Sequence, residues 1–290
     1  MNIPLVVSPQ WLQKNLYDPA IQVIENGWIR DAYQKAHIDG AVSVPGHPYL
    51  KHINVDGEQT QHVMNAGEFK SLCHELGLQR DKHYILYDDL FGLFAARFWT
   101  VCRHYGLHNV SILDGSWRGW LDQGYPVSGR VEHPVPGSDV SVEPNPTHLI
   151  GWEELWRVHR EPDIQIWDNR RAGEYSGEEQ TANRRRGHIP GALHLEWTDL
   201  IMEPPYEGGP RYLKPAAELE QMLVDLGLRR DKTIITYCQS GNRAAFCDLV
   251  LEHLGFPQHR MYDGSMGEWS NMTETPLVSG IDPVEGVGKP

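Results

Sequence analysis

Short apolar runs alternate with amphipathic stretches along both halves of the chain. Residues 164–168 and 233–237 are rich in β-branched and aromatic side chains and end at polar residues, which predicts two buried strands. Residues 216–226 place leucine or methionine at helical spacing, and residues 244–254 follow the second strand, so each is expected to form an α-helix. A glycine follows both stretches, as is typical of helix ends. This alternation favours an α/β fold with a mostly parallel sheet and helices on both faces.

The chain also repeats itself. GLQRDKHYILYD at 77–88 matches GLRRDKTIITYC at 227–238, HIDGA at 37–41 matches HIPGA at 188–192, and DGS recurs at 114–116 and 263–265. The offsets are nearly constant at 150 (227 − 77), 151 (188 − 37) and 149 (263 − 114) residues. A period of this length corresponds to a domain rather than to a solenoid repeat. We therefore expect two tandem α/β domains of the same kind.

Composition places the boundary between these domains. Residues 126–146 contain five prolines and little apolar periodicity, which predicts an extended and fairly stiff linker. The first domain is then expected over residues 1–125, the second over residues 147–280, and a loose tail over residues 281–290.

Charge and hydrophobicity exclude several kinds of function. The 290 residues carry a net charge of −13, which argues against binding to nucleic acid or to anionic lipid. No apolar run approaches the roughly 20 residues that span a bilayer, and the N-terminus lacks the features of a signal peptide. We therefore expect a soluble cytoplasmic protein with a normal core and with neither nucleic-acid nor membrane partners.

Four cysteines, at positions 73, 102, 238 and 247, include no CxxC pair. They predict neither a disulfide framework nor a zinc site, so we expect no bound metal. Cys238 differs from the others because it directly follows the strand predicted at 233–237 and precedes a helix. Ligands of open α/β sheets bind at this carboxyl edge.

The loop Cys238-Gln239-Ser240-Gly241-Asn242-Arg243 is suited to an ionised thiol. Gly241 and Asn242 tolerate unusual backbone conformations, so the loop can curl and point its N–H groups inward. The following helix contributes partial positive charge, and Arg243 contributes a full one. We expect this environment to lower the pKa of Cys238 and to make it a nucleophile.

Loop length separates two chemistries. Cys238 and Arg243 enclose four residues, whereas cysteine-dependent phosphatases of similar architecture use a CX5R loop that surrounds a phosphoryl group. The six-residue loop is tighter and suits one extra sulfur atom on the cysteine. A phosphatase or arsenate reductase is the rival enzyme class, and the short loop argues against it.

Three features are shared with a known family: the HIxGA block in each half, the strand that ends in Tyr-Cys, and DGS with a following tryptophan (Trp117, Trp269). In these the chain resembles the tandem-domain rhodaneses, the thiosulfate and 3-mercaptopyruvate sulfurtransferases. The resemblance implies two rhodanese-like domains and no cofactor. It also implies a catalytically inactive first domain, because Asp88 pairs with Cys238 in the repeat and a carboxylate cannot carry sulfane sulfur.

The resemblance further implies a two-step reaction. Cys238 takes the outer sulfur of a small anionic donor, and the Cys238 persulfide passes it to cyanide or to a cellular thiol. Thiosulfate is the donor we favour, and 3-mercaptopyruvate is the alternative. A non-enzymatic persulfide carrier or regulatory binding module is the alternative from another class.

The residues expected to bind the donor are the rest of the loop, Gln239 to Arg243, together with Arg184 or Arg185. Ser240 matches the mercaptopyruvate-like pattern, but Arg243 stands where both family patterns have threonine. Glu174 stands where the family has a donor-binding arginine, so mercaptopyruvate loses one anchor here. A compact dianion needs only a positive pocket, which is why thiosulfate is favoured.

Trp28 is a further candidate, because the segment around it resembles a family segment whose tryptophan faces the persulfide. His47, His62 and Asp56 lie in a long polar loop from which related enzymes contribute a histidine and an aspartate. The sequence assigns no role to these three.

Overall fold

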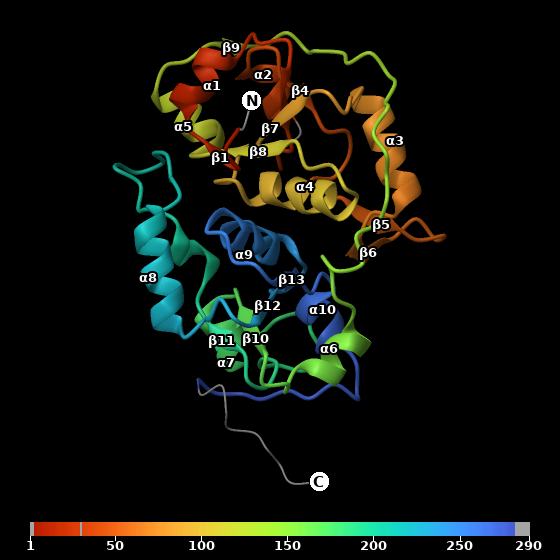
Figure 1. Ribbon diagram of the computed structural model, residues 1–290, viewed down its shortest axis with the longest axis vertical. Coiled ribbons are helices and arrows are strands. Elements are labelled where there is room, and N and C mark those ends of the chain that lie inside the picture. Colours follow the sequence, from red (N-terminus) through yellow and green to blue (C-terminus); the bar gives the residue numbers. More distant parts are fainter. Residues whose placement is uncertain (1–2, 30, 282–290) are drawn as a thin grey trace. The chain divides into compact units, whose positions relative to one another are not determined.

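The computed structural model describes residues 3–29 and 31–281, so all but the first residue of the tail expected at 281–290 lies outside it. The chain divides into two compact units (Figure 1). Unit 1 comprises Met1–Asn145 and Ile201–Leu213, and unit 2 comprises Pro146–Leu200 and Lys214–Pro290. Each unit contains one parallel sheet, so the expected fold class is confirmed.

Unit 1 is built on a five-stranded sheet in the order β1-β8-β7-β2-β4, with all neighbours parallel. Its strands are β1 (Val6–Val7), β2 (Ile21–Glu25), β4 (Val42–Ser43), β7 (His83–Tyr87) and β8 (Val110–Leu113). Its helices are α1 (Pro9–Asn15), α2 (Ala32–Lys35), α3 (Ala66–Leu76), α4 (Leu93–His104) and α5 (Ser116–Asp122). Two antiparallel ribbons are added, β3 (His37–Ile38) with β9 (Val127–Ser128) and β5 (Lys51–Ile53) with β6 (Gln59–Val63). Helix α4 packs directly against the central strands β7 and β8.

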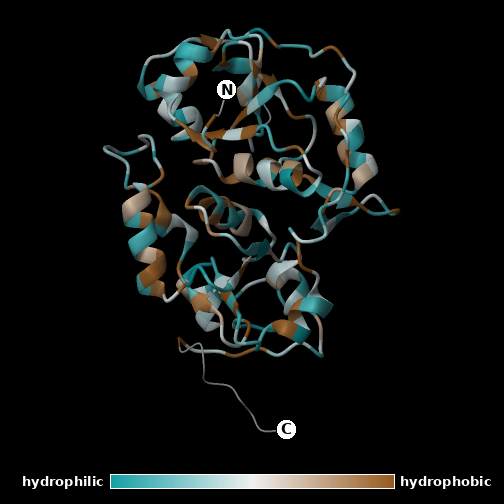
Figure 2. Cartoon of the chain, viewed as in Figure 1, coloured by the Kyte–Doolittle hydropathy of each residue, from teal (hydrophilic) through white to brown (hydrophobic). Residues whose placement is uncertain are grey.

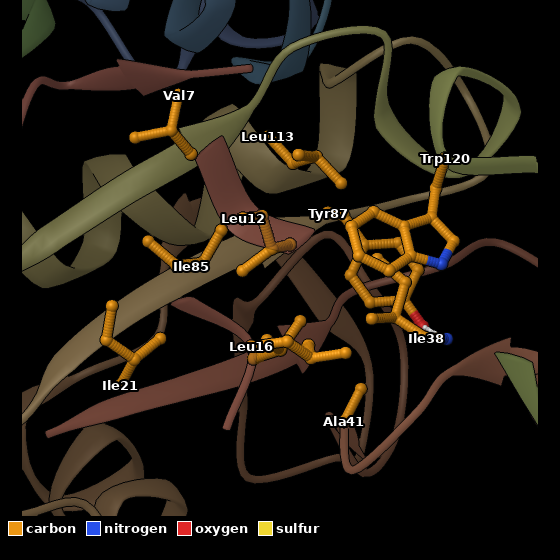
Figure 3. Packing of buried hydrophobic residues seen from close by; sticks show 11 residues of the cluster. Val7, Leu12, Leu16, Ile21, Ile38, Ala41, Ile85, Tyr87, Leu113 and Trp120 are labelled. Atoms are coloured by element: carbon orange, nitrogen blue, oxygen red, sulfur yellow. Dashed lines mark hydrogen bonds between the residues drawn. The ribbon is translucent and has the colours of Figure 1, made fainter. Parts of the chain in front are cut away.

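One apolar core of unit 1 joins the first helix to the sheet (Figure 3). Leu12, Ile85 and Trp120 are fully buried in it. Burying one side chain of this size contributes roughly 1.5–3 kcal/mol, so the cluster holds α1 and α5 on the sheet. Tyr87 ends β7 inside the same cluster, and its hydroxyl accepts a hydrogen bond from the Ile38 N–H at 3.3 Å.

Two segments outside the strand–helix pattern also belong to unit 1. Within residues 126–146, Val127–Ser128 forms β9, and the remainder contains neither helix nor strand. This remainder bonds to the unit, for example from the Gly137 N–H to the His74 carbonyl at 2.8 Å. The second segment, Ile201–Leu213, comes from the middle of the second sequence repeat. Its Leu213 N–H donates to Asp114 at 2.8 Å.

Unit 2 is built on a four-stranded parallel sheet in the order β11-β10-β12-β13. Its strands are β10 (Ile164–Asp168), β11 (Leu193–His194), β12 (Thr233–Tyr237) and β13 (His259–Met261). Its helices are α6 (Trp152–Val158), α7 (Ala172–Ser176), α8 (Ala216–Leu226), α9 (Asn242–His253) and α10 (Ser265–Trp269), with a 3-10 turn η1 (Trp197–Leu200). The predicted strands at 164–168 and 233–237 are confirmed to the residue.

The two predicted helices of unit 2 are also present. Helix α8 has the predicted bounds, and Figure 2 shows both hydrophobic and hydrophilic residues along it, as its half-buried position requires. Gly227 ends α8 in the left-handed region at φ 94°. Helix α9 begins two residues before the predicted start, because Gly241 already serves as its N-cap. None of the helices in the described part of the chain is long and apolar enough to cross a membrane.

The two sheets repeat one another in register. In unit 1, Glu25 at the end of β2 pairs with Tyr87 of β7, and in unit 2, Asp168 at the end of β10 pairs with Tyr237 of β12. The Tyr237 hydroxyl accepts the Ile189 N–H at 3.2 Å, as the Tyr87 hydroxyl accepts the corresponding N–H in unit 1. Residues at these strand ends can therefore be compared one to one.

Candidate active site

Cys238 lies where the sequence predicts it, directly after β12 at the carboxyl edge of the sheet of unit 2. The residue is 1% exposed. Its sulfur accepts the N–H of Gly241 at 3.2 Å, its own N–H donates to Ser265 Oγ at 3.1 Å, and its carbonyl accepts the Met266 N–H at 3.0 Å. The thiol is thus fixed inside a curled loop between β12 and α9.

Gly241 makes this curl. It adopts φ 88°, a left-handed conformation that costs a residue with a Cβ roughly 1–2 kcal/mol. The turn directs the Gly241 N–H at the sulfur and starts α9, whose first N–H groups carry partial positive charge. The predicted curled loop is therefore present, and the Gly241 N–H is the donor that it directs at the sulfur.

Arg243 closes the loop in a buried ion pair. Its two Nη atoms donate to the Glu174 carboxylate of α7 at 2.7 and 2.9 Å. The Glu174 side chain is 3% exposed and that of Arg243 is 15% exposed. Burial opposes the charge of Glu174, but the bonds from Arg243 hold the pKa of this carboxyl below its ordinary value. Both partners are charged, and the positive charge of Arg243 is balanced.

This pairing corrects the expectation that Arg243 offers a free positive charge to the donor. Arg185 is not available for that task either. Its guanidinium binds main-chain oxygens at the end of α10 and in the segment that follows, with Trp269 at 3.1 Å and Thr275 at 2.7 Å among its acceptors. Arg184 is exposed, and its N–H donates to Asn271 at 2.8 Å. The structure therefore leaves Arg184 as the one of these three whose role stays a prediction.

A second pair holds the loop at Gln239. Its side-chain amide exchanges two hydrogen bonds with that of Asn183, at 2.8 and 3.0 Å. Ser240 is half-buried and Asn242 is buried. Asn183 was not among the residues that the sequence analysis expected at the site.

Below the loop, a buried charge network supports the sheet edge. The Arg170 guanidinium donates to both oxygens of Asp168 at 2.7–3.1 Å and to the Gly187 carbonyl at 2.8 Å. The Tyr237 hydroxyl donates to the same carboxylate at 2.5 Å. Burial disfavours the charge of Asp168, but Arg170 lowers the pKa of this carboxyl below its ordinary value. The strand that carries Cys238 is therefore tied to its neighbour by a fully bonded carboxylate.

The corresponding loop of unit 1 holds a carboxylate in place of the sulfur. Asp88 follows β7, is fully buried, and accepts the N–H groups of Leu90, Gly92, Phe94 and Ala95 at 2.7–2.9 Å and the Ser116 hydroxyl at 3.0 Å. The N-cap glycine of α4, Gly92, is four residues after Asp88, whereas Gly241 is three after Cys238. This loop is thus one residue longer, and the donors that point inward are occupied by its own side chain.

The other candidates lie outside the Cys238 loop. Burial raises the pKa of Cys73 to about 12 and that of Cys102 and Cys247 well above the usual range, so these thiols are protonated. Trp28 belongs to unit 1, is 48% exposed, and stacks on Phe94 with centroids 5.6 Å apart. His47 packs edge-on against the Trp28 ring, and Asp56 and His62 are exposed on the β5–β6 ribbon. Within residues 3–29 and 31–281, no group of His, Cys, Asp or Glu is arranged to hold a metal ion.

Comparison with known proteins identifies the family. A family model described as a rhodanese-like domain matches residues 8–123 and 152–272. The 3-mercaptopyruvate sulfurtransferase of Escherichia coli K12 is 32% identical over 290 residues, which cover 96% of this chain and 99% of that protein. The thiosulfate sulfurtransferase of Azotobacter vinelandii is 33% identical over 284 residues, with 95% and 97% covered.

A solved structure agrees with these matches. SseA from Escherichia coli, a 3-mercaptopyruvate sulfotransferase, is similar with a TM-score of 0.77 and 29% identity, covering 91% of this chain and 99% of that chain. The relatives match nearly the whole chain, and the family model matches once in each half. The chain belongs to the rhodanese family of sulfurtransferases and contains two rhodanese-like domains.

Proposed function

We propose that Cys238 is the nucleophile of this sulfurtransferase and that it carries the transferred sulfur as a persulfide. The observation that carries the proposal is the hydrogen bond from the Gly241 N–H to the Cys238 sulfur at the start of α9. A donor fixed at the sulfur stabilises a thiolate, and it would equally stabilise the negative charge of a persulfide. The equivalent loop of unit 1 supports this assignment. There a carboxylate, that of Asp88, occupies the position of the Cys238 sulfur and accepts five hydrogen bonds.

Sulfur moves in two displacement steps. The Cys238 thiolate attacks the outer sulfur of thiosulfate, a Cys–S–S bond forms, and sulfite leaves with the electron pair of the broken S–S bond. Cyanide or a thiolate then attacks the outer sulfur of the persulfide and releases the Cys238 thiolate. With cyanide the product is thiocyanate. No net oxidation of the enzyme occurs, and the cycle needs no cofactor.

Thiosulfate is the donor we propose, with 3-mercaptopyruvate as the alternative. Because Glu174 balances the charge of Arg243, this arginine does not supply an unpaired positive charge for the donor. Recognition of thiosulfate therefore rests on the loop N–H groups and Arg184. Position 174 is a glutamate in an ion pair, which leaves no carboxylate-binding arginine there for mercaptopyruvate. Steady-state rates with equal concentrations of the two donors and cyanide would decide between them.

Replacing Cys238 with serine tests the mechanism. Wild-type protein incubated with thiosulfate and cyanide is expected to form thiocyanate, and C238S is expected to form none above background. Thiosulfate alone should add one sulfur, about 32 Da, to the wild type and not to C238S, as measured on the intact protein. Thiocyanate formation by C238S would refute the proposal. A stable persulfide without repeated turnover with either donor would favour the carrier alternative, and turnover of an aryl phosphate would favour a phosphatase.

Gly241→Ala probes the hydrogen-bond donor at the sulfur. Alanine at φ 88° costs roughly 1–2 kcal/mol, and relaxation of the backbone would turn the N–H away from Cys238. We expect kcat/KM for thiosulfate to fall at least about tenfold, which corresponds to loss of one such donor. Gly191→Ala is the control, because Gly191 has a similar φ of 82° and open space around it. G191A should show a comparable loss of stability with unchanged kcat/KM, whereas equal kinetic losses in both variants would contradict the role given to Gly241.

A further inference from the structure

Unit 1 contains a buried carboxyl group with one oxygen that no described residue bonds. Glu25 ends β2 and is 5% exposed, and its Oε2 atom has no hydrogen-bond partner among the described residues. The side chain borders a pocket of about 170 Å³ that is also lined by Gly27, Tyr33, Ser43 and Gly46. A buried polar atom without a partner costs free energy, so a group of this kind beside a pocket points to a ligand.

The sequence repeat shows what such a carboxyl group pairs with. Asp168 occupies the same register position in unit 2, and Arg170 stands two residues after it with its guanidinium on both carboxylate oxygens. Two residues after Glu25, unit 1 has Gly27. Unit 1 therefore keeps the acidic residue, as Glu25, but has Gly27 where unit 2 has Arg170. The pocket lies beside this glycine.

The charges around Glu25 are negative. A Cβ atom built on Gly27 would lie 3.0 Å from Glu25 Oε1 and 3.5 Å from Asp89 Oδ1, so two carboxyl groups flank this glycine. Burial, then Asp89 and Asp88, raises the pKa of Glu25 from 4.5 to about 8. Among the described residues, the hydroxyls of Tyr33 and Tyr87 also interact with Glu25.

We propose that the pocket beside Glu25 binds a small organic cation with a guanidinium group, placed where unit 2 holds the side chain of Arg170. The guanidinium N–H groups would donate to the Glu25 carboxylate and supply the missing counter-charge. The pocket is much larger than the roughly 10–15 Å³ that a single water needs, so a planar cation of several heavy atoms has room. The residues that line this pocket belong to unit 1, whereas the Cys238 loop belongs to unit 2.

Binding is expected to depend on pH through Glu25. A cation pairs with the ionised carboxyl, so affinity should rise with pH and level off above the pKa of about 8. Below that value, each pH unit should weaken the apparent affinity by about tenfold. The dissociation constant at pH 6.5 should therefore be more than tenfold higher than at pH 8.5.

Methylguanidinium is the probe that tests the site, with binding to the full-length protein followed by NMR or by calorimetry. Wild type should bind it at pH 8.5, while methylurea, a neutral molecule of nearly the same shape, should not bind. Glu25→Gln keeps the shape and removes the charge, so it should abolish binding. Gly27→Arg should also abolish it, because an arginine of the chain then occupies the pocket as Arg170 does in unit 2.

Binding that persists in E25Q, equal binding of methylurea, or an affinity that does not change with pH would each overturn the proposal. Arg30 lies outside the described residues and is three residues from Gly27. The variant Arg30→Ala therefore tests whether this arginine competes with the added cation. R30A should bind the probe like wild type, and binding that emerges only in R30A would also overturn the proposal, because wild type would then not bind the cation. Circular dichroism and thermal unfolding, compared with wild type, show that each variant is folded.

Discussion

Replacing Glu174 with alanine is expected to lower the free energy of unfolding of unit 2 by about 3 kcal/mol and kcat/KM by about a hundredfold. The stability loss follows from the buried charge of Arg243, since removing one partner of a buried pair leaves the other uncompensated. The kinetic loss follows because Arg243 closes the loop that holds Cys238, and a displacement of about 1 Å at a reacting group costs about that much rate. Denaturant unfolding and steady-state thiocyanate formation measure the two effects.

Two further variants separate charge balance from a general loss of packing. Glu154→Ala removes the partner of Arg260 in an ion pair that is more exposed, and it should cost less than about 1 kcal/mol. The double variant E174A/R243T removes both charges and places threonine where both family loop patterns have it. It should recover part of the stability that E174A loses. A double variant as unstable as E174A would show that the pair is not the source of the effect.

The sequence predicted those parts of unit 2 whose signals are local. The strands at 164–168 and 233–237 are continuous apolar runs, and helix 216–226 is marked by its period and by Gly227. Strand ends of a parallel sheet lie at one edge, so the place of Cys238 followed from its position in the chain. The repeat supplied the counterpart Asp88 in the same way.

The pairing of loop side chains was not predicted, because it joins residues far apart in the chain. Glu174 and Arg243 are separated by 69 positions, and Asn183 and Gln239 by 56. The sequence analysis interpreted Glu174 as a lost anchor and Arg243 as a free charge. Both residues depart from the family pattern, and their charges are opposite, which is the signal that could have indicated a pair. The position of Ile201–Leu213 in unit 1 had no such signal.

Replacing Asp88 with alanine is the other variant with a large expected effect. Its carboxylate is fully buried and accepts four N–H groups, which would lose this acceptor. It also accepts the Ser116 hydroxyl, which would keep the Asp88 carbonyl as an acceptor at 2.9 Å. An unsatisfied buried donor costs roughly 1–3 kcal/mol, and rearrangement of the loop or entry of water would recover part of the total. We expect unit 1 to lose at least about 3 kcal/mol. The amides of residues 90–95 should exchange with deuterium far faster than in wild type.

Asp88→Asn and Asp122→Ala make this result specific to the carboxylate. Asparagine has nearly the same shape, but its NH2 group faces N–H donors, so D88N should lose much of what D88A loses. Asp122 is an exposed carboxylate of the same unit that accepts the Tyr206 hydroxyl, and D122A should change stability by less than about 1 kcal/mol. A D88A protein with wild-type exchange at residues 90–95 would mean that the loop holds its curl without an anion. In that case the one-residue insertion, rather than the carboxylate, would distinguish the unit 1 loop from the loop around Cys238.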